Sequence, residues 1–167
     1  MAELKTLNDL FIQRLKYVYD AEQRLTKALP QLSKAASTPQ LKQAFDAHLK
    51  ETESHVERAE RLFGFFDQKP NADTNPSIKG IVSAGEDVIG LKADPPVKDA
   101  ALIAAAQDAE HYEIAEYGTL RAWARVLGKQ EAVQLIEWTL EEEKKADQKL
   151  TDIAMSLNFQ AAAPHVR

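Results

Sequence analysis

The chain has 167 residues, 44% of them hydrophobic and 28% charged, which is typical of a soluble helical protein with one core. Its formal net charge is −5 and no basic cluster stands clear of acidic neighbours, so we expect no nucleic-acid partner. The absence of cysteine excludes disulfides and thiolate metal sites, which leaves oxygen and imidazole to hold any metal. With no secretory signal and no long apolar run, we expect a cytoplasmic protein without a membrane partner.

The first helical pattern runs from about Leu4 to Ala36 and carries a glutamate at a core-facing position. Pro30 inside this pattern predicts a bend or the end of the regular helix, and Ser37 to Pro39 predict a tight turn with a capping residue. The core-facing residues alternate steps of four and three: Phe11, Leu15, Val18, Glu22, Leu25, Leu29 and Leu32. Glu22 should therefore point inward with its apolar neighbours.

The second pattern runs from about Pro39 to Phe66, ends near Gly64, and precedes a long connection. Its broad stripe consists of Leu41, Phe45, His48, Glu51, His55, Ala59 and Leu62. Two prolines and several turn-forming residues make Asp67 to Pro76 a non-helical connection. Ser77 to about Leu91 predicts a short helix, weakened by three glycines, that covers a bundle edge or joins a dimer interface.

Two more long patterns follow, the third opening at Asp94 to Pro96 and stopping at Gly128. The third places Glu110 and Glu113 among apolar residues, and the fourth does the same with Glu143 before its periodicity fades after Leu157. We therefore predict an all-α fold: a ferritin-like antiparallel four-helix bundle with a long crossover and an extra short helix. The expected boundaries are a single domain over 1–158 and an irregular tail over 159–167.

The glutamates of the four long patterns form a candidate metal site. A buried, unpaired carboxylate costs several kcal/mol, so a group of them requires a shared cation or a dense hydrogen-bond network. Carboxylate and imidazole suit iron or manganese, and two adjacent ions need several carboxylates. The candidate ligands are Glu22, Glu51, Glu110 and Glu143, one from each helix, with Glu113, His55 and Asp147 supplying the rest.

Each of these residues also has an interpretation that involves no metal, because most glutamates in a highly charged chain cover a solvated helix face. Ile114 could replace Glu113 as the inward residue, and Glu142 could replace Glu143. His55 could be a hydrogen-bonded interior histidine, and Asp147 could pair with a neighbouring lysine. We expect His48 to pack in the core or to support a ligand, and His111 to point outward. The aromatic residues Tyr112, Tyr117, Trp123 and Trp138 are expected to pack in the core.

Four segments carry a resemblance to a known family: YVYDAEQRLTKALP, HLKETESHVERAERLF, AEHYEIAEYGTLRAWA and TLEEEKKADQKL. Over residues 5–157 the chain resembles the bacterial ferritin-like proteins of the YciE and YciF type, which are associated with stress responses. The resemblance implies a homodimer with the extra short helix at its interface, and kinship with rubrerythrin-like di-iron proteins.

The match to the rubrerythrin-like ligand pattern is partial. Glu110 and Glu113 match the third helix of that pattern, but Ser54 and Ala146 stand where histidines would follow Glu51 and Glu143. This leaves the residues one position further on, His55 and Asp147, as the replacements. The tripeptide Asp-Ala-Glu that ends at Glu22 recurs ending at Glu110, as expected for two related halves.

Two hypotheses of function follow. In the first, two iron or manganese ions at the bundle centre support oxidant defence through peroxide reduction or ferrous iron oxidation, with electrons from an external donor or from the iron itself. In the second, the chain is a non-enzymatic dimeric helical stress or interaction protein with a degenerate or incidental metal site. A storage cage is a third, weaker hypothesis.

Overall fold

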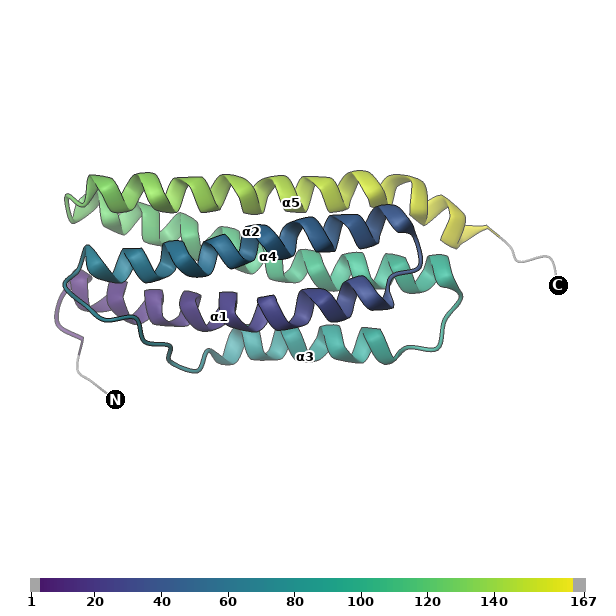
Figure 1. Ribbon diagram of the computed structural model, residues 1–167, viewed down its shortest axis with the longest axis horizontal. Helices are drawn as coiled ribbons and strands as arrows, with labels where there is room; N and C mark the ends of the chain where they lie inside the picture. The colour runs from purple at the N-terminus through teal and green to yellow at the C-terminus, as the bar shows by residue number, and fades with distance from the viewer. Residues whose placement is uncertain (1–3, 164–167) are drawn as a thin grey trace.

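The computed structural model describes residues 4–163, and every regular element in that range is a helix (Figure 1). The all-α prediction is therefore confirmed over these residues. The helices are α1 (Leu7–Ala35), α2 (Pro39–Gly64), α3 (Pro76–Gly90), α4 (Pro95–Val126) and α5 (Gln130–Ala162). None of the helices in the described part of the chain is long and apolar enough to cross a membrane.

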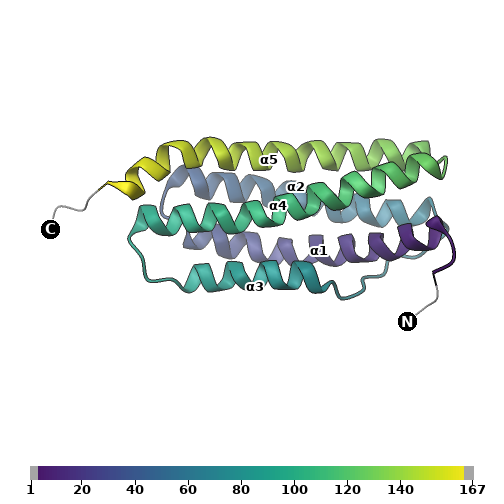
Figure 2. The ribbon, with the colours of Figure 1, turned by 180° about the vertical axis from the view of Figure 1, so that it is seen from behind.

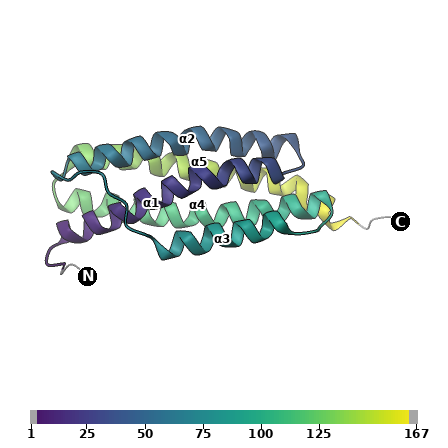
Figure 3. The same ribbon diagram turned by 60° about the horizontal axis from the view of Figure 1, so that its bottom comes forward.

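The four long helices lie side by side: α1 and α5 run in one direction, and α2 and α4 run in the other (Figures 1 and 2). α1 packs along α2, α4 packs along α5, and α2 also contacts α5. α3 occupies the outside of this group, against α1 and α4 (Figure 3). The connection from α2 through α3 to α4 thus returns the chain to the end from which α2 started.

Local sequence signals explain several helix ends. Thr6 and Asp9 form a reciprocal capping box at the start of α1, and the Asn75 side chain accepts from the Ser77 and Ile78 amides at the start of α3. Gly128 has a φ of 71° after α4, and the next amide, that of Lys129, donates to the Ala124 carbonyl at 3.0 Å. The predicted stop at Gly128 is confirmed.

Two expectations concerned helix continuity. α1 continues beyond Pro30 to Ala35, so of the two outcomes predicted for the proline, a bend or the end of the regular helix, the second does not occur. The predicted irregular tail over 159–167 is wrong over its first part, because α5 continues to Ala162. Leu157 is the last buried residue of α5, and residues 158–162 continue the helix with mostly exposed side chains, while residues 164–167 lie outside the described range.

Two hydrophobic clusters fill opposite ends of the helix group. One cluster includes Phe11, Leu62, Phe63, Leu120 and Ile136, where α1 begins and α2 ends. The other includes Leu29, Leu41, Phe45, Leu102 and Ile153 from the opposite ends of those helices. A third, smaller cluster holds α3 by its one fully buried residue, Ile78. The middle segments of the long helices lie between the two main clusters.

Candidate metal centre

The middle segments carry a layer of buried acidic and histidine side chains. Glu22 on α1, His55 on α2 and Glu143 on α5 are each 0% exposed. His48 on α2 and Glu110 and Glu113 on α4 are at most 6% exposed. Because apolar residues occupy the layers on both sides, these groups lose most of their hydration and depend on one another or on an ion.

These side chains form two groups with one shared member. The first group comprises Glu22, His55 and Glu143, and the second comprises His48, Glu110, Glu113 and Glu143. Within each group, one ligand atom from every residue lies within 4.8 Å of the others. Glu143 belongs to both groups, which is the arrangement required of a carboxylate that bridges two cations.

Several oxygens in this layer have no hydrogen-bond partner. The buried, unpaired atoms are Glu22 Oε2, Glu110 Oε2, Glu113 Oε1 and both carboxylate oxygens of Glu143. His55 Nδ1 is 2.8 Å from Glu143 Oε1, but the contact lacks hydrogen-bonding geometry and is an ion pair by distance alone. Tyr117 donates a short hydrogen bond to Glu22. Buried acceptors without partners, on residues that lie in two close groups, fit cations.

The electrostatics of the layer show the mutual repulsion of its carboxylates. Burial and the neighbouring charges of Glu22 and Glu143 raise the pKa of Glu113 well above its ordinary value. Burial also raises the pKa of Glu143, to about 8, although His55 opposes the rise. Without a cation, the layer must therefore retain protons near neutral pH.

The same surroundings disfavour the charged form of the carboxylates but favour the charged form of the two histidines. Burial disfavours their charged form, but the adjacent carboxylates outweigh it. The charge of Glu22 and the contact with Glu143 raise the pKa of His55 to about 10, and Glu110 and Glu51 raise the pKa of His48 well above its ordinary value. Protonated histidines thus offset part of the negative charge.

Five of the seven predicted ligands come together in the two groups: Glu22, His55, Glu110, Glu113 and Glu143. Glu51 does not join them, because its half-exposed carboxylate lies beside His48 Nδ1 at 3.2 Å. Asp147 does not join them either. Its carboxylate accepts from the Gln107 amide at 2.9 Å and lies 3.4 Å from His111 Nε2, between α4 and α5.

His48 is the group member that sequence reasoning did not count as a ligand. Its position on the core-facing stripe of α2, seven residues before His55, was the available signal. Two other buried acids were also missed. Glu116 pairs with Arg14, and Asp99 accepts from the Ser37 and Thr38 amides at 2.7 and 2.9 Å, which ties the α1–α2 turn to α4.

A cavity of about 80 Å³ lies between α2 and α5 and reaches the second group. His48, Glu51 and Glu110 line it, together with the small side chains of Ala47 and Ala146. Lys145 and Lys149 are also part of its lining. The cavity has room for only a few water-sized molecules, so it limits what can approach His48 and Glu110 by this route.

Fold and interior cluster together define a class: an all-helical protein whose buried acidic and histidine side chains are compatible with a metal site. Within that class, the chain belongs to the DUF892 family, a domain of unknown function whose pattern matches residues 6–163. It is 45% identical over 161 residues to Protein YciF of Escherichia coli K12, covering 92% of this chain and 93% of that protein. The resemblance to YciF-type proteins is confirmed.

Solved structures agree with this assignment. The E. coli stress protein YciF has a TM-score of 0.89 at 44% identity, covering 92% of this chain and 98% of that one. YcfI of Rhodopseudomonas palustris has a TM-score of 0.87 at 42% identity, covering 89% and 95%. A protein from Xanthomonas campestris has a TM-score of 0.74 at 19% identity, covering 92% and 94%, and shows the fold alone.

Proposed function

We propose that this chain is a ferritin-like di-metal carboxylate protein that takes part in stress or oxidant defence. In this proposal α1, α2, α4 and α5 constitute the four-helix bundle, and two iron or manganese ions occupy the two groups of the buried layer. The observation that carries the proposal is the pair of buried groups that share Glu143 and contain unpaired carboxylate oxygens.

The donor set fits two divalent cations in number and kind. Glu22, Glu110, Glu113 and Glu143 supply four negative charges when ionised, which equals the charge of two divalent ions. Carboxylate oxygen and imidazole nitrogen are ligands that iron and manganese accept. The same ions would satisfy the unpaired oxygens, so the cost of burying the carboxylates would be offset.

Bound iron would supply the electron transfer needed to reduce peroxide, or would itself be oxidised from the ferrous state. The residues of the chain hold and shield the centre. The hydrophobic clusters on either side exclude bulk water, and Tyr117 fixes one oxygen of Glu22 by its hydrogen bond. The small cavity beside His48 favours a small oxidant such as hydrogen peroxide over a bulky organic peroxide.

We further propose a homodimer and an external electron donor. The resemblance to YciF-type proteins supports a dimer with α3 at the interface. Only Ile78 of α3 is fully buried within the chain, so most of this helix remains available for contact. The chain has no cysteine with which to build its own iron–sulfur electron carrier, which supports a separate donor.

A second candidate function is a non-enzymatic dimeric stress or interaction protein with incidental metal. The ion pairs of His48 and His55 favour it, because protonated histidines can neutralise part of the layer without any cation. The relative YcfI is described as a candidate structural protein. Metal content distinguishes the two functions.

The test is the stoichiometry of ferrous iron or manganese in the purified chain, measured by elemental analysis after equilibration. We expect two ions per wild-type chain and about one ion fewer in Glu22→Gln and in Glu110→Gln, which keep the side-chain shape. Glu53→Gln, at an exposed position on α2, is the control and should bind as wild type. Substoichiometric metal that none of these substitutions changes would support the non-enzymatic function.

A further inference from the structure

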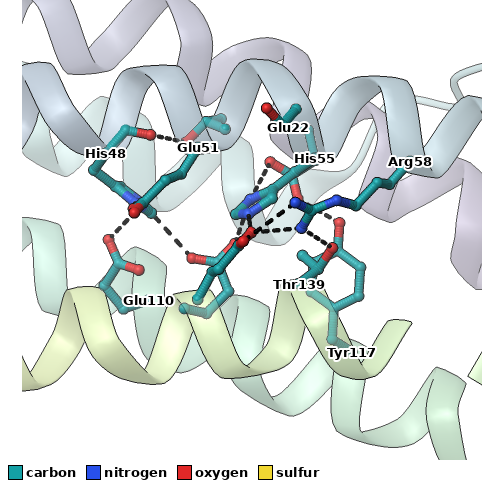
Figure 4. Close-up of polar contacts among 12 residues, drawn as sticks. Glu22, His48, Glu51, His55, Arg58, Glu110, Tyr117 and Thr139 are labelled. Carbon is teal, nitrogen blue, oxygen red and sulfur yellow. Dashed lines mark hydrogen bonds and ion pairs between the residues drawn. The ribbon is translucent and has the colours of Figure 1, made fainter. Parts of the chain in front are cut away.

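Two glutamates approach the buried histidines from the side away from the metal-binding groups. Glu51 lies one turn after His48 on α2, and Glu142 lies on α5 next to Glu143. Neither belongs to the two groups. Glu51 faces a ring nitrogen of His48 (Figure 4), and Glu142 faces a ring nitrogen of His55. As a result, one ring nitrogen of each histidine faces a glutamate outside the groups, and the other ring nitrogen faces the groups.

His48 directs Nε2 into the layer. That nitrogen is 3.1 Å from Glu110 Oε1 and 3.6 Å from Glu143 Oε2. Its other nitrogen, Nδ1, is 3.2 Å from Glu51 Oε2, at the outer side of the layer. The inner nitrogen is thus surrounded by candidate ligands of the second group, and the outer nitrogen has a single carboxylate.

His55 has the reverse orientation. Its Nδ1 is 2.8 Å from Glu143 Oε1 and 3.6 Å from Glu22 Oε2, both members of the first group. Its Nε2 is 2.9 Å from Glu142 Oε2. The two histidines of α2 therefore present opposite ring nitrogens to the layer, although they belong to one helix and lie seven residues apart.

We propose that His48 binds its ion through Nε2 and His55 binds through Nδ1, with Glu51 and Glu142 as positioning residues that are not metal ligands. This inference rests on the proposed di-metal site. A neutral imidazole carries one proton, and a carboxylate beside one nitrogen keeps the proton there and leaves the other nitrogen free to bind. Glu51, a predicted ligand, thereby acquires a different role.

The two outer contacts differ in rigidity. Arg58 pairs with Glu142 through both terminal nitrogens and also donates to Thr139 at 3.3 Å, so Glu142 is held from two sides. Glu142 therefore accepts from Arg58 with both oxygens while one of these oxygens faces His55 Nε2. Glu51 is 46% exposed, and His48 is the one side chain that hydrogen-bonds to it among those described.

The first test locates the imidazole protons in the zinc-loaded chain, zinc(II) serving as a diamagnetic probe. Long-range proton–nitrogen NMR spectra should show a retained N–H at Nδ1 of His48 and at Nε2 of His55, with the opposite nitrogens metal-bound. Metal on Nδ1 of His48 or on Nε2 of His55 would overturn the inference while leaving the di-metal site intact. A wild-type chain that binds no zinc would overturn both.

The second test measures zinc affinity and stoichiometry in variants. Glu51→Ala and Glu142→Ala should still bind as many ions as wild type, with affinity for the adjacent ion reduced by about 10–100-fold. The loss should be larger for Glu142→Ala, since the rigid contact is removed. Glu51→Gln and Glu142→Gln should recover most of the affinity, because an amide oxygen still accepts the imidazole N–H.

Matched controls are available on the same helices. Glu53 and Glu141 are exposed, and Glu141 pairs with Lys144 at 2.7 Å away from the layer. Glu53→Ala and Glu141→Ala should bind zinc as wild type does. Loss of one whole ion in Glu51→Ala or Glu142→Ala would make that residue a ligand, and unchanged affinity in both would remove their positioning role.

Discussion

Glu143 illustrates at the residue scale why this interior needs a counter-charge. It is 0% exposed, neither of its oxygens has a hydrogen-bond partner, and it belongs to both groups of the buried layer. The raised pKa of about 8 shows that its ionised form is unfavourable there without a cation. Such a residue is costly unless it serves a function, which is why it carries the strongest argument for a bridging ligand.

Metal binding should release protons at neutral pH. Glu113, Glu143, His48 and His55 all have raised pKa values, so the metal-free layer holds protons that an incoming cation must displace. Affinity for manganese should therefore rise with pH between 6 and 8, by about tenfold per pH unit for each proton displaced. Calorimetric titration in buffers of different ionisation enthalpy measures that release, and a value of zero would contradict the shifted pKa values.

At the element scale, contacts from distant helices replace some local helix caps. Thr38 occupies the N-cap position of α2 but makes no capping hydrogen bond with its side chain. Asp99 of α4 is 0% exposed and accepts from the backbone amides of Ser37 and Thr38. The turn between α1 and α2 is thus stabilised by a residue more than 60 positions away, which no local pattern could reveal.

Asp99→Ala should therefore destabilise the fold more than loss of the nearby threonine side chain does. Removal of the buried carboxylate leaves two amides without their acceptor and should lower the free energy of unfolding by about 2 kcal/mol. Thr38→Ala is the matched comparison and should cost less than about 0.5 kcal/mol. Urea denaturation followed by circular dichroism compares the two, and equal losses would refute the role of Asp99.

At the scale of the whole molecule, the site depends on its position between two hydrophobic clusters. The clusters fill the two ends of the helix group, and the acidic layer lies between them with contributions from α1, α2, α4 and α5. This arrangement keeps bulk water away from the carboxylates and links the stability of the helix group to the state of its centre. Bound cations should therefore stabilise the entire fold.

Manganese at about 100 times its Kd should stabilise the native state by about 2.7 kcal/mol per site. For a chain of this size, that corresponds to a rise in Tm of roughly 5–10 °C per ion. Differential scanning calorimetry with and without manganese measures the rise, and excess chelator should reverse it. The double variant Glu22→Gln/Glu110→Gln should show little or no shift; a full shift in that variant would place the stabilising ions elsewhere.

The sequence by itself determined the helices and the inward direction of Glu22 and Glu110, because the three-four periodicity of a helix fixes which residues share a face. Only the structure decided that Glu113 and Glu143, and not Ile114 and Glu142, are the buried residues. The tertiary structure alone decided which neighbours these residues meet. It brought His48 into the layer, turned Glu51 and Asp147 to other partners, and paired Glu142 with His55. Periodicity gives a direction within one helix, whereas contacts between helices depend on their relative rotation and offset, which arise only when the cores pack.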